Sequence, residues 1–258
     1  MAAPRVLVLR APGTNCDRET AFAFEQAGGS AELVHINRLL ENPLLLQKFQ
    51  ILCVPGGFSY GDDISAGRIL ANQIRHHLRE ACEEFRQSQK LVLGICNGFQ
   101  VLIKTGILLE DDERGPLATL AWNQRGRYED RWVTLSVHGD RCVLLRNMHS
   151  LYVPVAHAEG QFIARDSATL AQLDQRGQLV LRYAGADVRG QVPFPENPNG
   201  SQANVAGICD ATGRILGLMP HPERHIDPTQ HPRWTRGEGE TQGAGLALFQ
   251  NAISYFRD

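Results

Sequence analysis

The sequence lacks the features that mark several large classes of protein. Its 26 basic and 28 acidic residues leave a formal net charge of −2, so no excess of positive charge draws it to nucleic acid or to an anionic membrane. No apolar run approaches the length of about 20 residues that crosses a bilayer, and no signal-peptide pattern precedes the first apolar strand. We therefore expect a cytoplasmic protein that binds neither nucleic acid nor a membrane.

Paired cysteines and phosphate-binding loops are also absent. The six cysteines include no C-x-x-C pair, which in a chain of this size predicts reduced thiols and not a disulfide framework. The G-x-G-x-x-G pattern is missing after the first strand, and the chain contains no G-x-x-x-x-G-K-[ST] loop. These absences disfavour a dinucleotide-binding protein and leave the chain without a recognisable ATP site.

The chain does contain short apolar strands that alternate with helices. Strands are predicted at residues 5–9, 31–35 and Ile51–Val54, with a helix near 17–27 and a long helix that ends near Gln87. Such a βαβ opening predicts a parallel sheet. The composition, with 43% hydrophobic and 21% charged residues, is that of an ordinary globular protein. Since no repeat or linker divides the sequence, we expect residues 1–258 to form a single domain.

The pattern changes after Leu109. Short β-rich stretches follow one another without long helices between them, at residues 118–122, 128–137, 142–145 and 151–156. They predict antiparallel strands added to the parallel sheet, some of them near its functional edge. The sequence further predicts a helix at Ser167–Gln175, a strand at 179–183, a hairpin of Val205–Cys209 with 214–219, and a final amphipathic helix carrying Leu246, Phe249, Ile253 and Phe256.

One stretch, K-L-V-L-G-I-C-N-G-F-Q-V-L-I-K at 90–104, joins a buried strand to a helix. Between the two elements, G-I-C-N-G has the G-x-C-x-G form of a strand–turn–helix elbow, in which glycines allow a turn too tight for a Cβ. Because a helix N-terminus favours negative charge, it should also favour the thiolate of Cys96. We therefore interpret Cys96 as a nucleophile, against the alternative of an ordinary buried cysteine.

A potential base and a carboxylate stand two residues apart in M-P-H-P-E at 219–223. In an extended segment both side chains point to the same side, so that Glu223 would steady the imidazole of His221. Functional groups gather at the carboxyl ends of parallel strands, and we expect Cys96, His221 and Glu223 to form a triad for acyl transfer. Gly56 and Gly57, in the loop after the third strand, would let a backbone N–H approach the oxyanion, together with the N–H of Asn97.

Two of these features have other interpretations. His221, His225 and His231 are potential metal ligands, but Pro222 interrupts the helix that would present an H-x-x-x-H pair to one ion, and no cysteine or carboxylate pattern completes a site. Cys16 also lies in a loop after a strand and near a helix start, where a thiol can be activated. It has no flanking glycines and no visible base. We expect no metal site, and we expect Cys16 to line the site at most.

Several motifs together resemble a known family. G-I-C-N-G-F-Q and M-P-H-P-E-R are similar to the class I glutamine amidotransferases, which use a Cys–His–Glu triad. Within that class, four further segments resemble the family of glutaminase subunits of phosphoribosylformylglycinamidine synthase. They are R-A-P-G-T-N-C-D-R-E at 10–19, V-P-G-G-F-S-Y-G-D-D at 54–63, A-H-A-E-G at 156–160 and N-P-N-G-S at 197–201.

This resemblance implies an α/β fold, a flavodoxin-like, open and mostly parallel sheet with helices on both faces and an added antiparallel β segment. It implies hydrolysis of L-glutamine to glutamate and ammonia through a cysteine thioester. By role, the residues implied are the nucleophile Cys96, the base His221, its orienter Glu223, an oxyanion hole from the Gly57 and Asn97 backbones, and Gln100 as a contact to the substrate.

The resemblance implies no cofactor for the chain itself. ATP and Mg²⁺ would serve a separate synthetase subunit, which receives the ammonia and makes the amidine of purine synthesis. The resemblance also allows a small third subunit in the complex. Residues 225–243 depart from the family pattern, because they are longer than a simple connection from the triad to the last helix. This longer connection bears on how the partner docks.

Three other activities remain compatible with the triad. Another class I glutaminase, serving GMP, histidine or pyridoxal phosphate synthesis, would share it, although the loops at 10–19 and 197–201 favour the synthase family. A cysteine peptidase or γ-glutamyl hydrolase of similar fold would need no partner. A catalytically inactive regulatory subunit would keep the fold, but it would have no need of an intact Cys96, His221 and Glu223.

Overall fold

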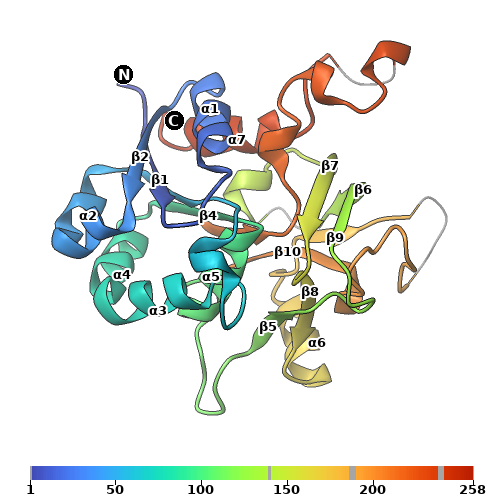
Figure 1. Ribbon diagram of the computed structural model, residues 1–258, viewed down its shortest axis with the longest axis horizontal. Coiled ribbons are helices and arrows are strands. Elements are labelled where there is room, and N and C mark those ends of the chain that lie inside the picture. Colours follow the sequence, from blue (N-terminus) through green and yellow to red (C-terminus); the bar gives the residue numbers. More distant parts are fainter. Residues whose placement is uncertain (1, 139–140, 186–189, 238–240, 258) are drawn as a thin grey trace.

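The computed structural model describes residues 2–138, 141–185, 190–237 and 241–257. These residues form a nine-stranded sheet in the order β2-β1-β3-β4-β11-β10-β9-β6-β7, and a separate two-stranded sheet of β5 and β8 (Figure 1). The strands are β1 (Arg5–Arg10), β2 (Ser30–His35), β3 (Ile51–Val54), β4 (Leu91–Ile95), β5 (Ala118–Ala121), β6 (Glu129–Val137), β7 (Ser150–His157), β8 (Gln161–Ala164), β9 (Leu181–Tyr183), β10 (Val205–Cys209) and β11 (Ile215–Leu218).

The first half of the large sheet is parallel, as the βαβ opening predicts. Strand β1 pairs in parallel with β2 and β3, β3 pairs with β4, and β4 pairs with β11. Every residue of β3, β4 and β11 is buried, because a strand covered on both faces needs a continuous apolar run. The carboxyl ends of β3, β4 and β11 therefore meet at one edge of the sheet.

The second half of the large sheet is antiparallel, which confirms the change of pattern after Leu109. Strand β10 pairs antiparallel with β11 and β9, and β6 pairs antiparallel with β9 and β7. The turn between β10 and β11 is held by Asp210, whose Oδ1 accepts hydrogen bonds from the N–H groups of Arg214 and Ile215. The strand predicted at 118–122 is wrongly placed in the large sheet: as β5 it pairs with β8 in the separate two-stranded sheet. Strand β8 itself is not predicted from the sequence.

Helices cover both faces of the parallel strands (Figure 1). Helices α1 and α7 lie together on one side, where the rings of Phe24 and Phe249 meet edge to face with centroids 4.9 Å apart, and α3, α4 and α5 lie on the other. None of the described helices is both long and apolar enough to cross a membrane. The helices are α1 (Asp17–Gln26), α2 (Ile36–Glu41), α3 (Arg68–His77), α4 (Arg79–Gln87), α5 (Asn97–Thr105), α6 (Ser167–Gln175) and α7 (Leu246–Ser254).

Three local predictions are wrong. The long helix ending near Gln87 is two helices, because Leu78 leaves helical geometry (φ −120°, ψ 7°), and no Pro or Gly marks the break. Residues 142–145 form no strand. They hold a short 3-10 turn, whose carbonyls at Leu144 and Arg146 accept hydrogen bonds from Asn251 of α7. Helix α2 has no counterpart in the predicted elements, and α7 ends before Phe256.

The connection that follows the predicted triad lies against the outer strands β6 and β7. The rings of His225 and His231 pack with Trp132 and Tyr152. The ring centroids lie 5.1 Å apart for His225 and Trp132, 5.3 Å for His231 and Tyr152, and 5.7 Å for His225 and His231. Figure 1 shows this segment extending beyond the end of β7. Residues 238–240 of the predicted 225–243 segment lie outside the described residues. The described part covers an edge strand, which would otherwise be open to pairing.

Candidate active site

Cys96 stands between β4 and α5, at the elbow that the sequence predicts. Its backbone has φ 51° and ψ −106°, a conformation that is costly for a residue with a side chain and that clusters at functional sites. The backbone is held on both sides, because the Cys96 N–H donates to the carbonyl of Leu218 and its carbonyl accepts from the Gln100 N–H. The side chain is 5% exposed.

The glycines of the elbow are required by close packing. A Cβ on Gly98 would lie 1.8 Å from the carbonyl oxygen of Val54, at the end of β3. A Cβ on Gly94 would lie 2.8 Å from the carbonyl carbon of Gly98. Helix α5 therefore starts directly against the ends of β3 and β4, and its first N–H groups, which have no partner within the helix, lie beside the Cys96 side chain.

His221 and Glu223 form a buried pair. The Nδ1 atom of His221 lies 2.6 Å from Oε1 of Glu223, and the two side chains are 2% and 1% exposed. The pairing confirms the contact that the spacing predicts, but its geometry differs. Glu223 lies in a 3-10 turn, Pro222–Arg224, and not in an extended segment. The His221 backbone is fixed by its N–H, which donates to the carbonyl of Pro154 on β7.

The pKa of His221 lies well above its ordinary value of 6.5. Burial of the ring acts to lower this pKa, because a buried imidazolium is poorly solvated. The negative charges of Glu223 and of a Cys96 thiolate outweigh burial and raise the pKa. Cys96 and His221 are therefore close enough to influence each other's protonation. The site favours a protonated His221.

A cavity of about 270 Å³ opens beside Cys96, and we call it the catalytic cavity. Its wall includes Gly57, Asp62, Gln100, Trp122, His157 and Glu159. The backbone of Gly57 has φ +142°, and a Cβ there would lie 2.8 Å from the backbone nitrogen of Asn15. Gly57 thus reaches the cavity together with Cys96, as the sequence predicts.

The side chain of Asn97 holds the loop after β3 in place. Its Oδ1 accepts a hydrogen bond from the Ser59 N–H at 3.1 Å, and its Nδ2 donates to Asp62 Oδ1 at 3.0 Å and to Gln100 Oε1 at 2.9 Å. Gln100 in turn donates to the carbonyl of Glu159. The amide of Gln100 is therefore engaged on both its oxygen and its nitrogen, with one N–H left to face the cavity.

His157 is a cavity residue that sequence reasoning did not single out. Asn123 donates through Nδ2 to the carbonyls of His157 and Arg127, so its Oδ1, 3.1 Å from His157 Nδ1, accepts from that nitrogen. Burial lowers the pKa of His157 to about 3, and the charge of His221 lowers it further. His157 is thus a neutral imidazole at neutral pH. The A-H-A-E-G motif at the carboxyl end of β7 carried the signal for it.

The low pKa of His157 predicts how stability depends on pH. Below pH 6.5 the unfolded chain protonates this residue while the folded chain does not, so His157 should lower the free energy of unfolding by about 1.4 kcal/mol per pH unit as the pH falls. His221 opposes this slope only near pH 6.5, where the unfolded chain is still partly neutral at this residue, and adds none well below it, since the folded chain keeps His221 protonated throughout. Urea unfolding between about pH 6.5 and pH 5 should show a steeper loss of stability for the wild type than for His157→Gln. Equal slopes would contradict a neutral buried His157.

Cys16 lies close to His221, although it is not among the residues that line the catalytic cavity. A Cβ on Gly56 would lie 3.0 Å from Cys16 Sγ and 2.9 Å from His221 Cε1, so the two side chains flank the same glycine. Arg224 Nη2 donates to Cys16 Sγ at 3.2 Å. Burial raises the pKa of the Cys16 thiol, and the neighbouring His221 opposes that rise.

Comparison with known proteins assigns the family. A family model described as a CobB/CobQ-like glutamine amidotransferase domain matches residues 3–256. A Dehalococcoides mccartyi protein named phosphoribosylformylglycinamidine synthase subunit PurQ is 45% identical over 100% of this chain and 99% of its own length. A Methanococcus maripaludis protein of the same name is 40% identical over 98% of this chain and 97% of its own length. The chain belongs to the PurQ family of glutamine amidotransferases.

A solved structure of a family member has the same fold. The matching chain in the structure of PurLQS from Thermotoga maritima has a TM-score of 0.72 and is 29% identical, over 99% of this chain and 100% of its own. The family and the fold class predicted from the motifs are therefore confirmed. Among the alternatives compatible with the triad, the relatives' names favour the PurQ glutaminase over the other class I glutaminases and over a peptidase.

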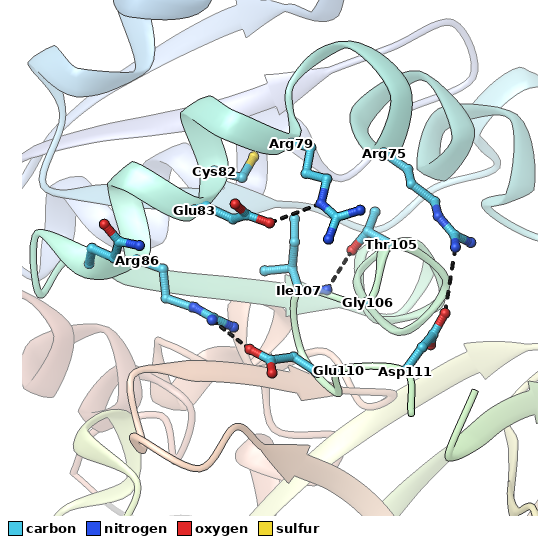
Figure 2. A pocket seen from close by; sticks show the side chains of 11 residues that line it. Arg75, Arg79, Cys82, Glu83, Arg86, Thr105, Gly106, Ile107, Glu110 and Asp111 are labelled. Carbon is cyan, nitrogen blue, oxygen red and sulfur yellow. Dashed lines mark hydrogen bonds and ion pairs between the residues drawn. The ribbon is translucent and has the colours of Figure 1, made fainter. Parts of the chain in front are cut away.

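A second, larger cavity of about 440 Å³ lies at the other end of α5, near Thr105. Figure 2 shows three arginines around it, each directed toward a carboxylate. The pairs are Arg75 with Asp111 (3.6 Å), Arg79 with Glu83 (2.9 Å) and Arg86 with Glu110 (2.5 Å). Because each positive charge is matched by a negative one, this cavity has no excess of either sign, and it lies apart from the PurQ-family site at Cys96.

Proposed function

We propose that Cys96, His221 and Glu223 are the catalytic triad with which this PurQ-family chain hydrolyses glutamine. The Sγ of Cys96 attacks the carboxamide carbon of the substrate while His221 holds the thiol proton. The tetrahedral oxyanion is stabilised by the N–H groups of Gly57 and Asn97. His221 then gives its proton to the leaving nitrogen, and ammonia departs with formation of a glutamyl thioester.

The second half of the reaction uses the same groups. A water molecule gives a proton to His221 and attacks the thioester carbon, and collapse of this intermediate releases glutamate and returns the proton to Cys96. Glu223 stabilises the imidazolium in both halves and keeps the proton on Nδ1. The observation that carries this mechanism is the buried contact of 2.6 Å between His221 and Glu223, next to a cysteine held in a strained elbow.

The catalytic cavity suits a small zwitterionic substrate. Gln100 would contact glutamine through its remaining N–H. The carboxylates of Asp62 and Glu159 line the same wall, and we assign them to the side that receives the α-ammonium group. The chain would use no cofactor of its own in this reaction, because the thiol, the imidazole and the backbone N–H groups supply each step.

As a member of the PurQ family, the chain is the glutaminase component of phosphoribosylformylglycinamidine synthase. Its partner would be a synthetase subunit that uses ATP and Mg²⁺ to convert formylglycinamide ribonucleotide to the amidine. The complex would also contain a small third subunit, in keeping with the three letters L, Q and S in the name of the Thermotoga maritima complex PurLQS. We place this complex in the cytoplasm, in keeping with six free cysteines, and we treat residues 1–258 as one functional domain.

The partner would dock on the face around the catalytic cavity. Phe58 and Trp122 line the mouth of the cavity and are 44% and 62% exposed. Phe194, 40% exposed, lies under the guanidinium groups of Arg125 and Arg131 at 4.0 and 4.5 Å from its ring centroid. Exposed aromatic side chains and arginine are typical of protein–protein interfaces. This face would carry ammonia directly from Cys96 to the partner.

Dependence on the partner tests this function. The isolated chain should hydrolyse glutamine slowly, because ammonia released to water at neutral pH becomes ammonium and is wasted. Adding the synthetase subunit with its nucleotide and substrate should raise the rate of glutamate formation at least tenfold, which corresponds to about 1.4 kcal/mol in barrier height. Equal rates with and without the partner would favour a stand-alone hydrolase.

A pair of matched variants locates the docking face. Phe194→Ala should reduce the activation by the synthetase while the basal rate stays unchanged. Phe22→Ala, which removes a ring of similar exposure (52%) on α1, should leave the activation intact. Activation that is insensitive to Phe194→Ala would place the interface elsewhere.

A further inference from the structure

A cluster of potential metal ligands lies beside the triad. Cys16, Glu19, His221 and Glu223 each bring one donor atom to a group in which all four atoms lie within 4.8 Å of one another. Cys16 comes from the loop after β1, Glu19 from the first turn of α1, and the other two from the turn after β11. Cys16 and Glu19 are not among the residues that line the catalytic cavity. The cluster therefore extends from the triad toward α1.

Two residues of the cluster each have one buried side-chain atom without a hydrogen-bond partner. Among the described residues, His221 Nε2 and Glu223 Oε2 both lack one, although their side chains are 2% and 1% exposed. Buried polar atoms usually have a partner, and an unsatisfied one needs an explanation such as an ion or a catalytic role. The Nδ1 atom of His221 already pairs with Glu223 Oε1, so Nε2, once it has lost its proton, is the nitrogen that remains to bind a metal ion.

A thiol, an imidazole and carboxylates are the donors that Zn²⁺ selects in proteins. We propose that Cys16, Glu19, His221 and Glu223 form an inhibitory site for Zn²⁺, outside the reaction cycle of the enzyme. Binding would replace the thiol proton of Cys16 and the Nε2 proton of the His221 imidazolium, both of which pass to solvent, and the ion would then occupy Nε2 of His221. An imidazole whose Nε2 is bound to zinc accepts no proton from Cys96. The bound ion would thus stop the first step of glutamine hydrolysis.

Arg224 stands where the ion would enter. Its Nε donates to Glu19 Oε1 at 3.0 Å and its Nη2 to Cys16 Sγ at 3.2 Å, so the guanidinium is paired with two of the four proposed ligands. The Arg224 and Glu19 side chains are 34% and 38% exposed, which gives both room to turn toward solvent. Arg224 would therefore compete with the cation, and its removal should strengthen the binding of zinc.

The proposed site differs from the more obvious one, a zinc ion shared by Cys96 and His221. Binding of Zn²⁺ to the full chain, measured by calorimetry, separates the two. Cys96→Ala keeps all four proposed ligands and should bind one Zn²⁺ with an affinity within about threefold of the wild type. Cys16→Ser should weaken binding by about 100-fold or more, since even changes to residues behind a metal ligand cost 10–100-fold. Arg224→Gln should tighten binding.

Spectroscopy and activity give two further readouts. Co²⁺ added to Cys96→Ala should show the sulfur-to-cobalt charge-transfer absorption of a thiolate ligand, and Cys16→Ser should lack it. Zn²⁺ should inhibit glutamine hydrolysis by the wild type, with recovery on addition of a chelator, and should inhibit Cys16→Ser far less. If Cys16→Ser proves unstable, Glu19→Gln provides a second test, with weaker binding expected.

The proposal is overturned if the wild type binds no Zn²⁺, if Cys16→Ser binds it as tightly as the wild type, or if Cys96→Ala abolishes binding. The binding measurements use an inactive variant and do not depend on glutaminase activity. A failure of the zinc site is therefore distinguishable from a failure of the proposed function.

Discussion

Replacing Cys96 by alanine should lower kcat for glutamine hydrolysis by on the order of 10⁴-fold or more, because the thioester intermediate no longer forms. Neighbouring groups offer no substitute. The thiol of Cys16 lies outside the catalytic cavity, and burial raises its pKa, so it stays protonated. The measurement is steady-state glutamate production by the variant in complex with the synthetase, where the wild-type rate is highest.

A matched variant controls for the loss of a buried thiol. Cys82 is 6% exposed on α4. It lines the second cavity of about 440 Å³ near Thr105 and not the catalytic cavity. Cys82→Ala should retain a rate close to that of the wild type. If Cys96→Ala retained more than a small fraction of the activity, or if Cys82→Ala lost as much, Cys96 would not be the nucleophile.

Removing the base should have the second-largest effect. His221→Ala deletes the group that takes and returns the proton, and general acid–base catalysis contributes on the order of 10²–10⁴-fold to a rate. Glu223→Gln should cost less, because the amide oxygen still accepts a hydrogen bond from Nδ1 and only the negative charge is lost. Steady-state assays of the two variants, each checked for folding by circular dichroism, decide the order.

The opposite order would show that the two roles are misassigned. Glu223→Gln should also lower the pKa of His221, since the Glu223 charge is the main influence that raises it. The basic limb of the kcat/KM profile, along which the His221 imidazolium loses its proton, should therefore shift toward lower pH in that variant. A profile that does not move would contradict the electrostatic pairing of the two residues.

The nucleophile was predictable from the sequence because its geometry is local. Gly94 and Gly98 indicate a turn that leaves no space for a Cβ. The structure gives the reason, because a Cβ added to Gly98 would lie 1.8 Å from the carbonyl oxygen of Val54. The spacing of His221 and Glu223 predicted their contact correctly, although a 3-10 turn and not an extended segment brings them together. Short-range patterns thus predicted the positions of all three residues of the proposed triad.

The rest of the site depends on contacts between distant segments. His157 is a neutral wall residue because it is buried close to the charge of His221, and Asn123, from another loop, holds its ring. Cys16 and Arg224 are 208 positions apart and still share a hydrogen bond. Residues 142–145 likewise contain a turn and no strand, and Asn251 of the distant helix α7 donates hydrogen bonds to the carbonyls of Leu144 and Arg146. Local propensity contains no information about such partners.

The most direct test of the central claim is to trap the nucleophile. An electrophilic diazoketone analogue of glutamine should bind in the catalytic cavity and alkylate Cys96, while the other five cysteines remain unmodified. Peptide mass spectrometry of the complex, with and without excess glutamine as a competitor, locates the adduct. The account predicts a single adduct on Cys96 that glutamine prevents. An adduct on Cys16 with Cys96 unmodified would contradict it.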